Sequence, residues 1–168
     1  MDGFSNSTDL DQGSNQPSGM GQSMRVVIQR VSSAQVTSAG KLLGEIGPGL
    51  CLLVGFGPGD TPEHADWVAA KIAGLRLFPD DSGKMNRSVM ESGGGVLVVS
   101  QFTLYADVAR GRRPSFVGAA PPELALSLYR HFLVSLRRFE LAVAAGEFGA
   151  MMQVSLTNDG PVTIILEH

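Results

Sequence analysis

The feature that most constrains the fold is an uninterrupted apolar run, GLCLLVGFG, at residues 49–57. It has the length of a β-strand, and neither of its alternating faces carries a polar side chain, so it predicts a strand that is covered on both faces. A second apolar run, at residues 96–99, leads directly into a polar segment. Buried strands of this kind favour a mixed domain of strands and helices.

Two segments have the apolar spacing of amphipathic helices, residues 63–78 and residues 121–139. Asp60 or Thr61 can cap the first helix, and Pro62 suits its first turn because the missing N–H has no partner to lose there. The second segment opens with two prolines and then repeats leucine and phenylalanine at helical intervals. Both segments are therefore predicted to be the main helices.

Most of the remaining chain consists of short β-branched or apolar stretches separated by turn residues. The first stretch is interrupted at Ser32-Ser33, and the last two are divided at Asn158–Pro161. The predicted strands lie at residues 24–31, 34–40, 41–47, 49–57, 95–106, 141–158 and 160–168. Residues 79–94 are polar and glycine-rich and are predicted as a loop. These strands and two main helices predict an α/β (α+β) fold, a single domain with a largely antiparallel, barrel-like sheet.

The first 23 residues differ sharply from the rest of the chain. They are rich in Ser, Asn, Gly and Asp and hold too little apolar surface to offset the entropy of ordering. We therefore predict a disordered extension at residues 1–23 and a folded domain at residues 24–168. No secretory signal or membrane-length apolar run is visible, and the single cysteine, Cys51, fits a reducing compartment. A cytoplasmic protein without membrane contact is expected.

The overall charge does not indicate a nucleic-acid-binding protein, since the formal net charge is -3. One segment departs from this balance, because Arg110, Arg112 and Arg113 lie close together on a predicted loop. The residues alone leave two interpretations open, a phosphate-binding surface and a solvated loop without a partner.

The usual catalytic and metal-binding patterns are absent from the sequence. The three histidines, His64, His131 and His168, do not have the spacing of metal ligands, and Cys51 has no CxxC partner. No GxSxG motif occurs, and the glycine-rich residues 55–60 lack the Lys and Ser/Thr of a P-loop. Neither a metal nor any other cofactor is therefore expected.

Two segments remain as candidates for chemistry. Ser100-Gln101-Phe102-Thr103 follows an apolar strand, where backbone N–H groups can face a developing oxyanion, although the same groups can simply cap a turn. Gly160-Pro161 is a turn signal, and a cis peptide bond there would make a rigid backbone surface that tests the shape of a ligand. The residues alone leave both structural alternatives open, a strand end and a plain hairpin turn.

Seven segments taken together resemble the D-aminoacyl-tRNA deacylase (D-tyrosyl-tRNA deacylase) family, over the chain from Met24 to Glu167. They are MRVVIQRVSSAQV, GEIGPGLCLLVG, KIAGLRLFPDDSGKMNRSV, VVSQFTLYAD, GRRPSF, FGAMMQVSLTNDGPVT and IILE. SQFTL and NDGPVT are specific markers of the family in combination, and their order and spacing agree with it. The resemblance implies the fold of that family.

The resemblance also implies an activity and an assembly. Members hydrolyse the ester that joins a D-amino acid, or glycine, to the terminal ribose of tRNA, and they spare L-aminoacyl-tRNA. They are homodimers, in which the cis Gly160-Pro161 pair of one subunit would enter the pocket of the other and exclude L-amino acids. The residues that would hold the aminoacyl group and line its pocket are Ser100, Gln101, Phe102, Thr103, Phe148 and Met152.

Thr163 has an open role in this scheme. A threonine at this position resembles a nucleophile, yet no general base is evident in the sequence. We therefore favour RNA-assisted hydrolysis, in which a ribose hydroxyl assists water and Thr163 is auxiliary. Arg110, Arg112 and Arg113 would contact the single-stranded end of the tRNA, and no DNA partner is expected. The alternatives are a nucleic-acid-binding module without catalysis and an esterase that acts on small substrates.

Overall fold

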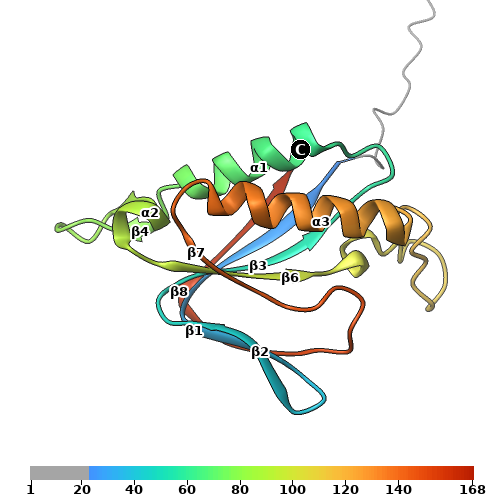
Figure 1. Cartoon of the computed structure of the whole chain (residues 1–168), viewed down its shortest axis with the longest axis horizontal. Coiled ribbons are helices and arrows are strands. Elements are labelled where there is room, and N and C mark those ends of the chain that lie inside the picture. The colour runs from blue at the N-terminus through green and yellow to red at the C-terminus, as the bar shows by residue number, and fades with distance from the viewer. Residues whose placement is uncertain (1–22) are drawn as a thin grey trace, which may run out of the picture.

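The computed structural model describes residues 23–168, so the predicted disorder of residues 1–23 falls almost wholly outside it. The described chain forms a six-stranded sheet and a separate two-stranded sheet, and two long helices cover one face of the larger sheet (Figure 1). The elements in chain order are β1 (Arg25–Ser38), β2 (Lys41–Ile46), β3 (Gly49–Gly55), α1 (Pro62–Gly74), β4 (Phe78–Pro79), β5 (Met85–Arg87), α2 (Val89–Ser92), β6 (Gly95–Ser100), the 3-10 helix η1 (Phe102–Tyr105), α3 (Pro122–Arg137), β7 (Ala142–Ala145) and β8 (Gln153–Glu167).

β1 is the central strand of the larger sheet. Its first half pairs antiparallel with β3, its second half pairs antiparallel with β2, and β8 pairs antiparallel along its other edge. β6 and β7 extend the sheet beyond β3 in parallel. A Cβ on Gly44 of β2 would lie 3.2 Å from Ala144 Cβ of β7, so the sheet is nearly closed into a barrel. The predicted α+β domain with a barrel-like sheet is confirmed.

Both faces of the sheet bury apolar side chains. The face under α1 and α3 contains Ile28 and Leu52, and Phe132 of α3 packs into the same group with no exposed surface. The opposite face buries a smaller group that includes Cys51 and Leu97. β3 contributes to both groups, so the double coverage predicted from its apolar run is confirmed.

α1 begins as predicted and ends early. Thr61 Oγ1 accepts a hydrogen bond from the N–H of His64 at 3.3 Å, which caps the helix. The helix ends at Gly74, whereas the apolar spacing predicts a helix to residue 78. The apolar spacing continues past Gly74 because Leu77 and Phe78 are also buried, but they lie in a non-helical segment that leads into β4.

Five other predicted boundaries are wrong. The strand predicted at residues 95–106 ends at Ser100, where η1 follows, and the strand predicted at residues 141–158 is interrupted between the end of β7 and the start of β8. Residues 79–94 do not form a plain loop, since they contain β5 and α2, and Ser88 and Glu91 form a capping box at the start of α2. Ser32-Ser33 does not divide β1, because a shift of register against β8 accommodates these exposed residues. Asn158–Pro161 lies inside β8 and does not separate two strands.

Cys51 is expected to be unreactive in the folded protein. The residue is 1% exposed, and burial raises the pKa of its thiol from 9.0 to about 11 because the thiolate loses its hydration. An aromatic disulfide reagent at mildly alkaline pH should leave Cys51 unmodified in buffer and modify it in concentrated urea. Rapid modification without denaturant would contradict the burial of β3.

Candidate active site

The segment Ser100–Thr103, called the polar turn below, lies where β6 ends at the edge of the sheet. β6 is buried up to Val99, and Ser100 is its last residue. The N–H of Gln101 donates to Val54 O of β3 at 2.7 Å, which holds the chain at the end of the strand. The backbone then enters η1, and the side-chain amide of Gln101 donates to Thr103 Oγ1. The polar turn is therefore fixed from both the strand and its own side chains.

Two backbone N–H groups of the polar turn are unpaired. Among the described residues, neither the N–H of Phe102 nor that of Thr103 has an acceptor, because the hydrogen bonds of η1 begin with the N–H of Leu104. Phe102 is 58% exposed, and its ring meets Phe116 edge to face at a centroid distance of 5.1 Å. Unpaired N–H groups beside an exposed aromatic ring can bind a carbonyl or carboxylate oxygen.

No histidine or carboxylate is hydrogen-bonded to Ser100–Thr103 within residues 23–168. The buried Asp60 accepts from the N–H of Gly57 at 2.6 Å and contacts His64 Nδ1 at 3.3 Å, and burial raises its pKa. Burial, and then the charge of Asp60, raise the pKa of Tyr105, whose hydroxyl donates to a main-chain carbonyl. The carboxylate of Asp60 and the hydroxyl of Tyr105 are thus used in hydrogen bonds that stabilise the fold.

Gly160-Pro161 lies in a large bulge within β8, so the alternative that it forms a plain hairpin turn is wrong. β8 pairs with β1 at Thr163 and again at Asn158, and a single residue of β1, Arg30, faces the four residues between them. The Gly160-Pro161 peptide bond is cis, and Gly160 has a φ of +126°, which glycine adopts readily. Both residues are exposed, so the bulge presents them at the surface of the subunit.

Arg30 and Asn158 hold the bulge in place. Arg30 Nε donates to Asp159 O at 3.1 Å and its Nη1 donates to Leu77 O at 2.6 Å, so the guanidinium joins the bulge to the segment after α1. Asn158 Oδ1 accepts from the N–H of Val162 at 3.1 Å and closes the bulge from within. Sequence reasoning missed both residues. An arginine inside the apolar stretch VVIQRV was the available signal for Arg30.

Thr163 lies at the base of the bulge. Its Oγ1 accepts from Asn158 Nδ2 at 3.0 Å and is 3.4 Å from Gln29 Nε2. An amide cannot take a proton from a hydroxyl, and no histidine or carboxylate is hydrogen-bonded to Thr163 in the described chain. This geometry provides no general base for a nucleophilic threonine.

Phe148 and Met152 lie in the segment between β7 and β8, next to the end of β6. The N–H of Gly146 donates to Val98 O at 2.9 Å, which ties this segment to the strand that carries Ser100. The ring of Phe148 packs on the helix side of the sheet, whereas Met152 packs against the buried group of the other face. The structure thus brings both residues to the end of β6 but on opposite faces.

The loop that carries the three arginines follows the polar turn directly. Asp107 and Ser115 exchange backbone hydrogen bonds of 2.8 and 3.0 Å, which close the loop at its base. Arg110, Arg112 and Arg113 are exposed between them, and none of the three forms an ion pair within the described part of the chain. Their charges are available to an external anion.

Within one chain the polar turn and the bulge are far apart. Ser100 of β6 is the register partner of Val54 in β3. The line of register partners continues across β1 to Leu166 of β8, so three steps between neighbouring strands separate Ser100 from β8. Three strand steps amount to about 14 Å at ordinary strand spacing. Pro161 lies five residues further along β8, which is about 17 Å in an extended strand. One chain therefore does not bring these two predicted parts of the site together.

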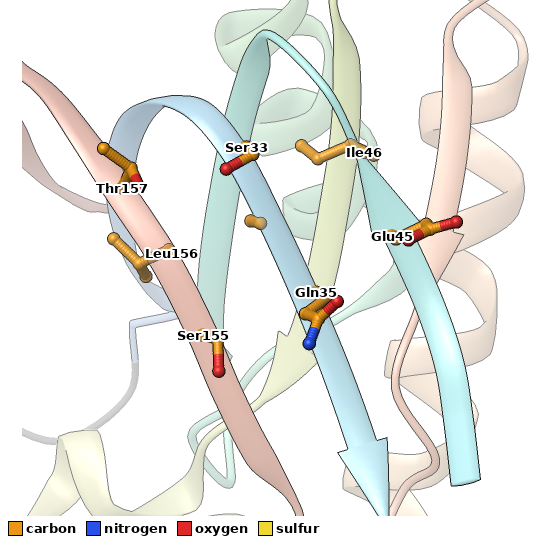
Figure 2. Close-up of a pocket in the computed structure, with 8 residues that line it drawn as sticks. Ser33, Gln35, Glu45, Ile46, Ser155, Leu156 and Thr157 are labelled. Atoms are coloured by element: carbon orange, nitrogen blue, oxygen red, sulfur yellow. The ribbon is translucent and has the colours of Figure 1, made fainter.

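Figure 2 shows a cavity elsewhere on the sheet. It has a volume of about 240 Å³ and lies over the second half of β1, between β2 and β8. Its polar lining comes from Ser33, Gln35 and Glu45, among others. It contains none of the candidate site residues, so the polar turn remains the candidate active site.

Residues 23–168 contain neither a cluster of metal ligands nor a membrane-spanning helix. No group of three or more His, Cys, Asp or Glu side chains there is arranged to hold a metal ion. No helix in this range is both long and apolar enough to cross a bilayer.

Known proteins match this chain over most of its length. The family model described as D-Tyr-tRNA(Tyr) deacylase matches residues 27–167. A protein of Roseiflexus castenholzii named D-aminoacyl-tRNA deacylase is 60% identical over 144 residues, which cover 86% of this chain and 92% of that protein. A protein of Deinococcus radiodurans with the same name is 54% identical over 144 residues, which cover 86% of this chain and 99% of that protein.

Two solved structures share the fold. One, named c-Myc DNA Unwinding Element Binding Protein, is 45% identical with a TM-score of 0.80, over 86% of this chain and 98% of that chain. The other, described as "a probable eukaryotic D-amino acid tRNA deacylase", has a TM-score of 0.77 over 88% of this chain and 100% of that chain. Its identity of 17% supports the fold alone.

A nearly closed sheet covered by two helices, matched by proteins named deacylases, defines an enzyme of the hydrolase class. The chain belongs to the D-Tyr-tRNA(Tyr) deacylase family. The family predicted from SQFTL and NDGPVT is thereby confirmed.

Proposed function

We propose that the chain hydrolyses the ester between a D-amino acid, or glycine, and the terminal ribose of tRNA, and that it spares L-aminoacyl-tRNA. The observation that carries this proposal is the polar turn, which offers two unpaired N–H groups beside the exposed Phe102 at the end of a buried strand. The relatives named D-aminoacyl-tRNA deacylase support the substrate class.

The unpaired N–H groups of Phe102 and Thr103 are the proposed oxyanion donors. When water attacks the ester carbonyl, negative charge develops on the carbonyl oxygen, and donors already in place stabilise it without reorganisation. Removing one donor of this kind from a hydrolase costs about 10²–10³-fold in rate. The hydroxyl of Ser100 and the amide of Gln101 hold the aminoacyl group, with Phe148 and Met152 beside it.

The tRNA itself supplies the group that assists water. No histidine or carboxylate is hydrogen-bonded to the polar turn or to Thr163 in the described chain, whereas a ribose hydroxyl lies next to the ester in every aminoacyl-tRNA. The ester is already reactive, so orientation and oxyanion stabilisation account for catalysis. Glycine is accepted because it has no side chain to exclude.

A second copy of the chain completes the site, since the bulge is too distant to serve the polar turn of its own chain. On the face of the sheet that the helices do not cover, Val27 lies between its register partners Leu53 and Ile165. Ile165 is 72% exposed. A symmetric homodimer would bury this apolar face and bring Gly160-Pro161 of one subunit toward the polar turn of the other. There the rigid bulge acts as a chiral filter that excludes the side chain of an L-amino acid.

The activity is tested by incubating the protein with D-aminoacyl-, glycyl- and L-aminoacyl-tRNA and measuring the ester that remains. Loss of the D and glycyl esters with the L ester spared is expected. Hydrolysis of small esters regardless of RNA would support an esterase instead. Binding without hydrolysis would support a nucleic-acid-binding module, the second candidate, which the relative named c-Myc DNA Unwinding Element Binding Protein favours.

Subunit exchange tests whether the bulge acts on the partner's site. Gly160→Ala protein, expected to hydrolyse L-aminoacyl-tRNA, is mixed with an excess of Gln101→Ala protein, whose polar turn is impaired. If the bulge acts across the interface, each intact polar turn in the mixed dimers faces an intact bulge, so L-hydrolysis disappears while D-hydrolysis continues. Unchanged L-hydrolysis after exchange would show that the bulge acts within its own chain.

The three loop arginines are proposed to bind phosphates at the single-stranded end of a cytoplasmic tRNA. Changing Arg110, Arg112 and Arg113 to Gln together should raise KM and reduce the slope of log affinity against log salt by about 2, at about 0.7 for each phosphate contact. Binding titrations over a range of salt concentrations measure this slope, with Arg138→Gln on the helix layer as the control. A slope equal to that of the wild type would contradict the phosphate contacts.

Thr163→Ala is expected to keep kcat within about tenfold of the wild type, a smaller effect than the loss of a general base or acid. Among residues 23–168 the hydroxyl is hydrogen-bonded only to amide groups, which can position it but cannot activate it. Single-turnover rates for Thr163→Ala and Thr163→Ser provide the comparison. Complete loss in folded Thr163→Ala, with recovery in Thr163→Ser, would assign Thr163 as the nucleophile.

A further inference from the structure

We propose that Arg25 is a positioning residue of the active site, which holds the backbone of η1 through the carbonyl of Leu104. This inference rests on the proposed function, because the proposed oxyanion donors belong to the same turn of backbone. Arg25 is the first residue of β1 and lies between β3 and β8 in the sheet.

Three contacts with different residues hold the guanidinium of Arg25. Its Nη1 donates to Leu104 O at 2.9 Å, and its central carbon lies 4.7 Å from the centroid of the Tyr105 ring. Its buried Nε lies 3.3 Å from Glu167 Oε1 on β8, an ion pair without the angle of a hydrogen bond. The side chain thus links η1 to two strands of the sheet.

The carbonyl of Leu104 depends on this donor. The last carbonyls of a helix have no partner within the helix, and η1 ends at Tyr105. The N–H of Asp107, which could otherwise turn toward this carbonyl, donates to Ser115 O. Leu104 and Arg25 also line one cavity of about 170 Å³. Without Arg25 the carbonyl would have to find another donor, and its peptide group would be free to rotate.

Rotation of this peptide group would also move the proposed oxyanion donors, because η1 is a single turn. Two backbone hydrogen bonds lie at the ends of this turn: the N–H of Leu104 donates to Gln101 O at 3.3 Å, and that of Ala106 donates to Thr103 O at 3.0 Å. A displacement of about 1 Å in a catalytic group can cost on the order of 100-fold in rate. The orientation of the N–H of Thr103 is therefore coupled to the contacts of Arg25.

The geometry of these contacts selects arginine over lysine. A planar guanidinium can donate to Leu104 O, approach Glu167 with a second nitrogen and place its face against Tyr105 at the same time. A lysine ammonium is a compact charge and cannot make the three contacts together. Arg25→Lys should therefore keep the charge without keeping the position of η1.

Kinetics provide the first test, with Arg25→Gln, Arg25→Lys and Glu167→Gln compared on D-aminoacyl-tRNA. In Arg25→Gln, kcat should fall on the order of 10- to 100-fold while KM stays within about twofold. Arg25→Lys should recover little of this loss, and Glu167→Gln should show a smaller fall. Arg138→Gln is the matched control, since its ion pair with Asp66, at 3.6 Å, lies on the helix layer. It should behave as the wild type.

Hydrogen exchange provides a second test that does not require activity. Amides of residues 101–106 should exchange faster in Arg25→Gln, while those of α3 and the melting temperature stay unchanged. Glu167→Gln supplies the same comparison if Arg25→Gln does not fold. Unchanged exchange at residues 101–106, a normal kcat despite faster exchange, or a rise in KM alone would each overturn the inference. An inactive wild type would refute the proposed function, and the exchange rates would still decide whether Arg25 holds η1.

Discussion

Gly160→Ala is expected to hydrolyse L-aminoacyl-tRNA at least about tenfold faster than the wild type, a change that corresponds to about 1.4 kcal/mol of lost discrimination. Gly160 has a φ of +126°, a backbone conformation that an L side chain rarely adopts. A methyl group there would lie 2.9 Å from Val162 Cγ2 and 3.0 Å from Arg30 Nη2, so the bulge or the guanidinium must move. The bulge is exposed, so the change affects the chiral filter rather than the core.

The ratio of kcat/KM for D- and L-aminoacyl-tRNA measures this effect. Gly83→Ala is the matched control, because Gly83 also has a positive φ of +81° but no atom lies within 4 Å of the added methyl group. Gly83 lies between β4 and β5, and its variant should keep the selectivity of the wild type. A folded Gly160→Ala dimer that still protects L-aminoacyl-tRNA fully would contradict the chiral filter.

Gly49→Ala is expected to lower the free energy of unfolding by more than about 3 kcal/mol. A Cβ on Gly49 would lie 1.9 Å from Gly95 O and 2.8 Å from Gly95 N and C, and these backbone atoms cannot rotate away. The two glycines are register partners at the start of the parallel β3–β6 pair. The strands would have to separate there. The same pairing ends at Ser100, so its loss would also displace the polar turn.

Urea unfolding followed by circular dichroism measures the loss. Gly47→Ala is the matched control, since no atom lies within 4 Å of its added methyl group and its φ is not positive. Its free energy of unfolding should stay within about 0.5 kcal/mol of the wild type. Equal unfolding midpoints for the two variants would show that β3 and β6 do not approach each other closely at this point.

The sequence by itself determined the two main helices, the doubly covered strand and the place of the polar turn. Thr61 and Pro62 start α1 as predicted, because capping and the missing proline N–H act within one turn of chain. The run at residues 49–57 is buried on both faces because it has no polar side chain to keep hydrated. Ser100 marks the end of the buried part of β6 because the polarity of the chain changes there, although the strand predicted at residues 95–106 extends too far. All of these features depend on residues that are close in sequence.

Only the tertiary structure decided how β8 pairs with β1 and therefore what Gly160-Pro161 is. As a local pattern, Asn158–Pro161 has the composition of a turn between strands. It is a bulge because both flanks of β8 pair with β1, and Arg30 reaches Asp159 across 129 positions of sequence to hold it. Strand register is set by which residues two distant segments bury together, and no short stretch contains that information.

The same reason separates the two parts of the site. SQFTL and NDGPVT predict one function together, yet in one chain three strand steps lie between β6 and β8. Arg25 likewise gains its contacts from Leu104 and Glu167, 79 and 142 positions further along the chain. Composition and spacing determine which groups the protein carries. Long-range pairing determines the distances between them, and those distances decide which groups can meet a single substrate.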